Sequence, residues 1–240
     1  MSSVVSGGAP GAPPAMTTTT APGLEPGDPA YAGQADYTPG FLAVYDPLVL
    51  GVMNRVMWRC PTGEILRLYE EHAAGAHLDV GPGTGWYLDH CRFEEPPEIT
   101  LFDANVYVLE KATRRLARLD PAVHQGNLLE STGLEPGTFD SISLTHVLHC
   151  LPGTMADKAA VLGRLAALLR PDGVLFGSTI LAGGVAHTPV SRGLMRFLNA
   201  RGVFGNGDDD LDALERALDG HFARHEVRTV GSVALFTAYG

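Results

Sequence analysis

The chain has 240 residues, 45% of them hydrophobic and 18% charged, which suits one sizeable α/β domain rather than two. The formal net charge of −10 argues against a nucleic-acid-binding surface, because neutralising phosphates requires clustered Lys and Arg and no such basic run occurs. No segment approaches the length of an apolar membrane span. The composition therefore favours an ordinary globular protein, whose acidic charge serves solubility.

Three cysteines, Cys60, Cys91 and Cys150, lie far apart and form no C-x-x-C pair. An odd number at this spacing is typical neither of a disulfide framework nor of a zinc site. We therefore expect three buried thiols, a reducing cytoplasmic location and no metal site.

Residues 1–36 are rich in Pro, Gly, Ala and Thr and cannot bury a core, which predicts a flexible tail. The tail lacks the basic start and long apolar stretch of a signal peptide. Met16 is an alternative start, which would leave residues 1–15 outside the native protein.

Residues 37–74 are expected to form a helical lid. The stretch "FLAVYDPLVLGVMNRVMW" is apolar on all sides, and Pro47 follows Asp46 at the position that suits the first turn of a helix. Val52 and Val56 recur at helical spacing, and such a helix calls for cover on several sides. A second helix is expected over "EILRLYEEHA".

Residues 75–240 alternate between strand and helix patterns and are expected to form the core. Strands are expected at 76–81, 98–103, 122–127, 138–147 and 174–180, with two more within 224–240. Helices are expected at 86–93, 106–119, 155–170 and 210–222. The last two strands flank Gly231 and are too close for a parallel crossover. The pattern predicts a doubly wound, Rossmann-like sheet of seven strands with the last strand antiparallel.

Local signals mark several boundaries of these elements. Asn105 is placed to cap the helix that follows it, and Thr154 with Asp157 forms a capping-box pattern. "RPDG" predicts a turn before the fifth strand. Residues 182–207 interrupt the alternation and are expected to form part of a substrate pocket, since ligands of such sheets bind beyond the carboxyl ends of the strands.

A glycine-rich loop follows the first strand of the core, in "HLDVGPGTGWYLDH". Its spacing is G-x-G-x-G, and Trp86 stands where the dinucleotide fingerprint has its third glycine. No G-K-[ST] triplet of a Walker loop is present. Asp79, two residues before the first glycine, would repel a pyrophosphate and suits an ammonium group. The loop therefore favours a ligand with a charged amine, and Trp86 and Asp79 disfavour an NAD-dependent oxidoreductase.

"LDVGPGTG" resembles the first motif of the class I S-adenosylmethionine-dependent methyltransferases of the small-molecule type. The family pattern E/D-x-G-x-G-x-G falls on Asp79, Gly81, Gly83 and Gly85. The resemblance implies S-adenosylmethionine as cofactor, with the loop against its methionine and adenosine parts and Asp79 facing the ammonium group.

Further motifs follow in the family's order. Asp103, with Ala104 beside it, ends the second strand, where the family binds the ribose hydroxyls with an acid. In "QGNLLE", Asn127 replaces the family's usual Asp. The resemblance implies that the amide oxygen of Asn127 accepts from the adenine amino group and that Leu128 packs on the ring.

The fourth-strand block "FDSISLTHVLHCLPG" and the following "LLRPDGVLF" also resemble small-molecule methyltransferases, which implies a cofactor contact from Thr145. "YDPLVLGVMNRVMWR" resembles the lid helices of the ubiquinone- and menaquinone-biosynthesis methyltransferases. The resemblance covers residues 37–240.

Methyl transfer requires aligned partners, exclusion of water and, for some acceptors, removal of a proton. His146 and His149 follow the fourth strand and are candidate bases, since the ordinary histidine pKa of about 6.5 suits general-base work at neutral pH. His146 is preferred because it lies nearer the strand end, whereas His149 aligns with a family histidine that is more often structural. His187 is a weaker candidate. Tyr45 is expected to touch cofactor or substrate, and packing of the lid is the alternative.

The same two roles, contact with cofactor or substrate and packing, are open for two other lid residues, Asp46 and Trp58, and for Trp86 and Tyr87 beside the loop.

The sequence predicts transfer of a methyl group from S-adenosylmethionine to O, N or C of a small, partly apolar molecule such as a specialised metabolite. The alternative is a protein of this fold that uses the pocket for a non-methylating reaction or as a binding module. Monomer and homodimer stay open.

Overall fold

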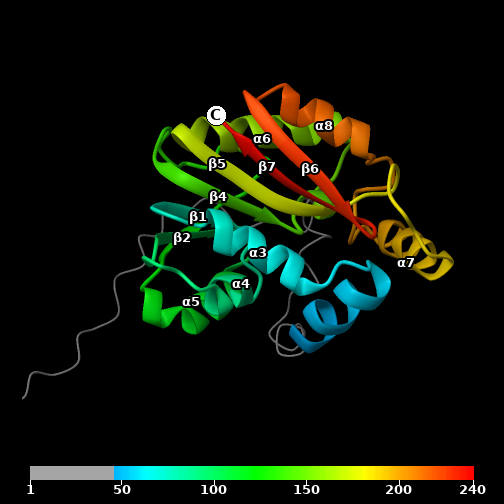
Figure 1. Cartoon of the computed structure of the whole chain (residues 1–240), viewed down its shortest axis with the longest axis horizontal. Helices are drawn as coiled ribbons and strands as arrows, with labels where there is room; N and C mark the ends of the chain where they lie inside the picture. The colour runs from blue at the N-terminus through cyan, green and yellow to red at the C-terminus, as the bar shows by residue number, and fades with distance from the viewer. Residues whose placement is uncertain (1–45) are drawn as a thin grey trace, which may run out of the picture.

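The structure is a computed structural model that describes residues 46–240, and residues 47–49 only in their backbone. Figure 1 shows one sheet with helices on both of its faces. The predicted tail, residues 1–36, lies outside the described residues, as does the start of the predicted lid, residues 37–45 with Tyr45.

Seven strands form a single sheet. They are β1 (Ala76–Val80), β2 (Glu98–Asp103), β3 (Ala122–Gln125), β4 (Phe139–Thr145), β5 (Leu169–Ile180), β6 (Arg224–Val230) and β7 (Val233–Tyr239). Their order is β3-β2-β1-β4-β5-β7-β6, with β1 to β5 paired in parallel and β7 antiparallel to both neighbours. Gly231, with φ of 61°, makes the tight turn between β6 and β7 that forces this reversal. The predicted doubly wound sheet with its last strand antiparallel is confirmed.

Helices cover both faces of the sheet. They are η1 (Asp46–Met57), α3 (Thr62–His72), α4 (Trp86–His90), α5 (Val106–Arg115), η2 (Ala117–Leu119), η3 (Leu148–Cys150), α6 (Met155–Leu168), α7 (Pro189–Ala200) and α8 (Leu211–Asp219). One hydrophobic cluster lies between the sheet and α6 and α8, and the other beneath α3, α4 and α5. Figure 1 shows where these helices lie. Within the described part of the chain, no helix is long and apolar enough to cross a membrane.

The predicted helix caps are present. The side chain of Asn105 accepts a hydrogen bond from the backbone N–H of Tyr107 at 2.9 Å. Thr154 and Asp157 exchange both hydrogen bonds of a capping box at the start of α6. These signals act over three residues or fewer, which is why the sequence alone identifies them.

The lid differs from its prediction in two ways. Its helix η1 is a π-helix, in which the backbone N–H of Trp58 donates to the carbonyl of Met53, five residues back, at 3.0 Å. Val52 and Val56 are 50% and 55% exposed, so the described residues of this chain do not supply the expected cover on this face. Apolar spacing predicts a helix but cannot reveal which neighbours the fold supplies.

The structure also adds detail at three other places. The predicted turn over "RPDG" lies inside β5, where Asp172 has a φ of 66° and the pairing with β4 shifts register. The predicted helix 86–93 ends at His90, because Cys91 is already extended. The insertion 182–207 contains the helix α7, which starts with Pro189 after a Thr188–Ser191 capping box.

The lid and the insertion meet at the carboxyl end of the sheet. The N–H of Ser232, in the β6–β7 turn, donates to the carbonyl of Trp58, and its hydroxyl donates to the carbonyl of Ala186, both at 2.9 Å. The N–H of Gly205 donates to the carbonyl of His149 at 2.8 Å. Figure 1 shows α7 at this end of the sheet. The chain thus builds walls beyond the carboxyl ends of β4 and β5, where ligands of such sheets bind.

Candidate active site

The loop from Gly81 to Gly85 links β1 to α4 and depends on its glycines. Gly81, Gly83 and Gly85 have φ of 68°, 57° and 74°, a region that disfavours side chains. A Cβ on Gly81 would lie 2.4 Å from the side chain of Val147, and one on Gly85 would lie 3.3 Å from the Cα of Ala112 in α5. The first glycine therefore lets the segment after β4 approach the loop, and the third lets α5 approach.

Asp79 lies in β1 immediately below this loop and is 2% exposed. Its Oδ1 accepts hydrogen bonds from the hydroxyls of Ser143, at 2.7 Å, and Tyr69, at 3.1 Å. Burial raises the pKa of Asp79 to about 6, although these hydrogen bonds oppose the rise. A cation beside this carboxylate would relieve the cost of burying it. The site therefore suits an amine-bearing ligand.

Asp103 ends β2, the strand next to β1, and forms the second acid of the same edge. Its Oδ1 accepts from the backbone N–H of Asn105 at 2.7 Å. Burial raises its pKa to about 7, and the charge of nearby Asp79 adds to the rise. The ionised carboxylate only accepts hydrogen bonds, so it suits a pair of ligand hydroxyls.

The residues assigned to the adenine end lie beside Asp103. The N–H of Gly126 donates to the carbonyl of Asp103 at 3.1 Å, which brings the loop after β3 to the end of β2. Asn127 is 8% exposed, and its Oδ1 accepts from the N–H of Leu129 at 3.0 Å. Leu128 is 6% exposed and belongs to the core cluster, and the carbonyl of Ala104 accepts from Gln125 at 3.0 Å.

We predict that ligand binding at these two acids depends on pH. At low pH both carboxyls are protonated and lose acceptor capacity, so the Kd of S-adenosylhomocysteine is expected to rise at least about tenfold from pH 8 to pH 5.5. Because both pKa values are raised in the folded state, the stability of the ligand-free protein should fall as pH rises from about 4 to 7. Titration calorimetry across this range measures the first effect and urea unfolding the second.

The Asp103→Asn variant is the control. It should bind S-adenosylhomocysteine more weakly at pH 8, and its Kd should lose most of the pH dependence above pH 6.5. A Kd that stays constant between pH 5.5 and pH 8 in the unaltered chain would contradict the assignment of these acids.

His146 follows β4 in a left-handed conformation, with φ of 58°. Its backbone N–H donates to the carbonyl of Ser178 in β5 at 2.9 Å, which holds it at the strand end. Both ring nitrogens are buried and have no hydrogen-bond partner among residues 46–240. Burial lowers the pKa of His146 to about 4, so the ring is neutral at pH 7 and each side chain nitrogen is available to a ligand.

His149 is engaged within the protein. Its Nδ1 accepts from the backbone N–H of Ile180 at 3.2 Å, and its ring packs edge-on against Phe204, with centroids 4.6 Å apart. Burial holds its pKa well below the ordinary value. The ring lies 5.4 Å from that of His146. These contacts connect β5 to the insertion and leave His149 less available than His146.

A cavity connects the glycine loop to the residues after β4. Gly81, Thr84, Tyr69, Thr145 and His146 are among its lining residues. The fold therefore brings four of the predicted cofactor-binding and catalytic positions to one hollow: Gly81, Gly83, Thr145 and His146. Sequence reasoning missed Tyr69, because a tyrosine on the apolar face of the second lid helix is read as packing, and only the tertiary structure shows its hydroxyl on Asp79.

The remaining candidates of the lid, the loop and the insertion make ring contacts, polar contacts or neither. Tyr87 stacks on Tyr69 with centroids 5.1 Å apart, and Trp86 stacks on His90 at 4.0 Å. Trp58 is 2% exposed and contacts Phe204 at a centroid distance of 5.9 Å. In the insertion, both ring nitrogens of His187 are buried without a hydrogen-bond partner in the described range. Asp46 forms the polar contacts described below.

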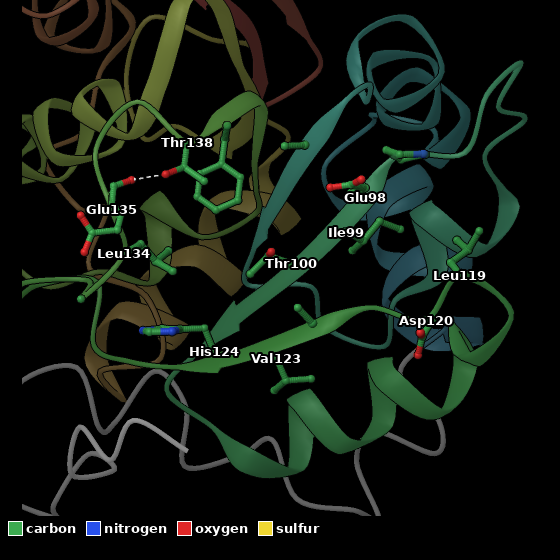
Figure 2. A pocket seen from close by; sticks show the side chains of 15 residues that line it. Glu98, Ile99, Thr100, Leu119, Asp120, Val123, His124, Leu134, Glu135 and Thr138 are labelled. Atoms are coloured by element: carbon green, nitrogen blue, oxygen red, sulfur yellow. Dashed lines mark hydrogen bonds between the residues drawn. The ribbon is translucent and has the colours of Figure 1, made fainter. Parts of the chain in front are cut away.

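A larger hollow of about 730 Å³ lies at the opposite end of the sheet (Figure 2). Glu98, Thr100, His124 and Leu134 are among its lining residues. Glu98 is the first residue of β2, so this hollow lies at the amino ends of the strands, away from the glycine loop. It is not the candidate site. Among the described residues, no group of three or more His, Cys, Asp or Glu side chains is placed to hold a metal ion.

A sheet of this order with a glycine loop after its first strand is that of the class I S-adenosylmethionine-dependent methyltransferases. A family model described as "Methyltransferase domain" matches residues 59–226. The chain therefore belongs to the methyltransferase family, and it is an S-adenosylmethionine-dependent enzyme that methylates a small molecule.

Curated relatives cover most of the chain. Demethylluteothin O-methyltransferase of Streptomyces thioluteus is 36% identical over 208 residues, covering 86% of this chain and 90% of the relative. The physcion biosynthesis cluster O-methyltransferase of Aspergillus chevalieri is 34% identical over 212 residues, covering 88% of this chain and 96% of the relative.

Solved structures share the fold. The geranyl diphosphate C-methyltransferase of Streptomyces coelicolor A3(2), solved with S-adenosyl-L-homocysteine, matches with a TM-score of 0.57 and 12% identity. The match covers 75% of this chain and 76% of that one. The two relatives named above support methyl transfer rather than the alternative of a non-methylating or binding role.

Proposed function

We propose that the chain methylates a hydroxyl oxygen of a small specialised metabolite and that His146 accepts the proton of that hydroxyl. The names of the relatives support oxygen as the acceptor, since both relatives reported above are O-methyltransferases. The observation that carries the role of His146 is its buried, neutral ring, which has both nitrogens unpartnered in the described residues and borders the glycine-loop cavity.

The proposed cofactor site combines the loop and the two acids. S-adenosylmethionine supplies a methyl group on a positively charged sulfur when it is bound. We assign its amino group to Asp79 and its ribose hydroxyls to Asp103, because one is a buried acid under the loop and the other ends the neighbouring strand. The three glycines allow the backbone to lie against the cofactor, and we assign Asn127, in the loop after β3, to the adenine amino group.

In this proposal His146 orients the acceptor hydroxyl and takes up its proton. The ring holds the acceptor hydroxyl by accepting its hydrogen bond, which directs an oxygen lone pair toward the methyl group. Methyl transfer cancels the positive charge of the sulfonium, so a cation on the imidazole meets less repulsion after transfer than before it. His146 can therefore take up the proton as the oxygen–carbon bond forms. We assign Thr145 to the neighbouring wall and His149 to positioning.

A labelling experiment tests the acceptor atom. The protein is incubated with methyl-¹³C-labelled S-adenosylmethionine and a panel of small hydroxylated, aminated and carbon-nucleophile compounds, and products are assigned by NMR. We expect label on oxygen, seen as a methoxy carbon shift. Label on nitrogen or carbon alone would overturn the choice of acceptor, and no transfer to any acceptor would favour the non-methylating alternative.

We also propose a cytoplasmic location for the protein. Burial raises the pKa of Cys60, Cys91 and Cys150 to about 12, so the three thiols are protonated and unreactive at neutral pH. All three are free rather than paired, which supports a reducing, cytoplasmic location. We keep monomer and homodimer as the two assemblies to distinguish by light scattering after size exclusion.

A further inference from the structure

Three side chains from distant parts of the chain meet where the described part of the lid begins. Asp46 is the first residue of η1, Thr84 lies in the glycine loop and Arg115 ends α5. The hydroxyl of Thr84 donates to Oδ1 of Asp46 at 2.5 Å, and Nη1 of Arg115 donates to the hydroxyl of Thr84 at 2.9 Å. Nη2 of Arg115 lies 2.5 Å from Oδ2 of Asp46. Each group therefore contacts the other two.

This triangle is better shielded than the other arginine pairs at the surface. Thr84 is 2% exposed, and the side chains of Arg115 and Asp46 are 23% and 24% exposed. In the pair between Arg118 and Asp89, which joins η2 to α4, the arginine side chain is 51% exposed and the nitrogen–oxygen distance is 3.5 Å. Charge-assisted hydrogen bonds gain strength as water is excluded, and the planar guanidinium holds two partners at once.

The triangle connects the lid to the loop proposed to hold the cofactor. Leu50, one turn after Asp46 in η1, borders the same cavity as Thr84 and His146. The carbonyl of Leu50 also accepts a hydrogen bond from the hydroxyl of Thr62 at the start of α3. The position of η1 over the cavity is thus fixed at one end by the triangle and further along by α3.

We propose that Arg115 is a positioning residue for methyl transfer, which fastens the beginning of the lid helix to the glycine loop through Asp46 and Thr84. A ligand that stabilises this conformation of the loop then also stabilises the closed lid, and by linkage the closed lid tightens ligand binding. The inference rests on the proposed placement of the cofactor against the loop. It is independent of which atom accepts the methyl group.

The Arg115→Met variant tests this coupling, with Arg118→Met as the matched control on the neighbouring pair. Calorimetric titration with S-adenosylhomocysteine is expected to give a Kd roughly tenfold higher for Arg115→Met and an unchanged Kd for Arg118→Met. Limited trypsin digestion reads the lid directly, since Arg55 within η1 and Arg59 just after it are exposed. The ligand should slow cleavage there in the unaltered chain and in Arg118→Met, but much less in Arg115→Met.

Two further variants keep the test decisive. Arg115→Lys retains the charge without the planar fork and should recover part of the affinity. Asp46→Asn should reproduce both effects of Arg115→Met, and the double variant should be no worse than either single one, because all remove the same contact. Equal Kd values and equal ligand protection in Arg115→Met and Arg118→Met would overturn the coupling. A failure of the unaltered chain to bind S-adenosylhomocysteine would instead overturn the cofactor placement and, with it, the coupling.

Discussion

Replacing His146 with Asn is expected to lower kcat by about 10²- to 10⁴-fold, the range typical of losing a positioned proton acceptor. The Kd of S-adenosylhomocysteine should stay within about twofold, because His146 is assigned to the acceptor side. Asn is the substitution of choice, since it tolerates the left-handed backbone that His146 adopts at φ of 58°. Single-turnover kinetics with labelled cofactor measures the chemical step separately from product release.

The pH dependence of kcat distinguishes a proton acceptor from a packing residue. The pKa of His146 is lowered to about 4, and a protonated ring cannot accept, so kcat of the unaltered enzyme should fall only as pH drops toward 4. This lower limb should disappear in His146→Asn. His90→Asn, at an exposed position on α4, is the control and should leave kcat and its pH profile unchanged. A loss of less than threefold in His146→Asn would contradict the assignment.

Replacing Lys158 with Met is expected to destabilise the protein by about 3–5 kcal/mol. Lys158 and Asp209 are both fully buried, and the ammonium group lies 2.5 Å from Oδ2 of Asp209 and donates to the carbonyl of Gly205 at 2.9 Å. Without the amine, a buried carboxyl is left without its cation. Burial already raises the pKa of Asp209 against the opposing effect of Lys158, so removing the lysine raises it further.

Urea unfolding at pH 7 measures the difference in free energy of unfolding between the unaltered chain and Lys158→Met. This difference should shrink as pH falls, because protonation of Asp209 removes the uncompensated charge. The double variant Lys158→Met with Asp209→Leu should regain most of the stability, since no buried charge remains. The only other lysine, Lys111, is partly exposed on α5, and its replacement by Met should cost less than about 0.5 kcal/mol. A loss below 1 kcal/mol for Lys158→Met would contradict the prediction that the buried carboxylate of Asp209 depends on this lysine.

The architecture and the cofactor motif follow largely from short-range rules. Alternating strand and helix patterns predict the parallel sheet, and the short connection around Gly231 forces the last strand to reverse. The glycine spacing together with Asp79 predicts the loop. The caps at Asn105 and Thr154 depend on neighbours only a few residues away. Each of these signals is visible in a single window of sequence.

Other features depend on contacts between residues far apart in the chain. The spacing of η1 predicts a helix, yet not a π-helix with two exposed valines, because the cover over η1 comes from distant elements. Lys158 is one of three charged residues in α6, and its partner Asp209 lies 51 residues away. The hydroxyl of Tyr69 meets Asp79 only because α3 packs against β1 in the folded chain.

The sequence by itself determined the fold class, the glycine loop and the acids near the carboxyl ends of β1 and β2, because hydrophobic period and backbone conformation are local properties. Only the tertiary structure decided which candidate histidine is available. His146 and His149 are three residues apart. The backbone N–H of Ile180 donates to the ring of His149, whereas the ring of His146 has no hydrogen-bond partner in the described residues and borders the cavity. It also joined Asp46 to Arg115 across 69 residues. Hydrogen bonding and desolvation depend on neighbours in space, which the order of residues does not specify.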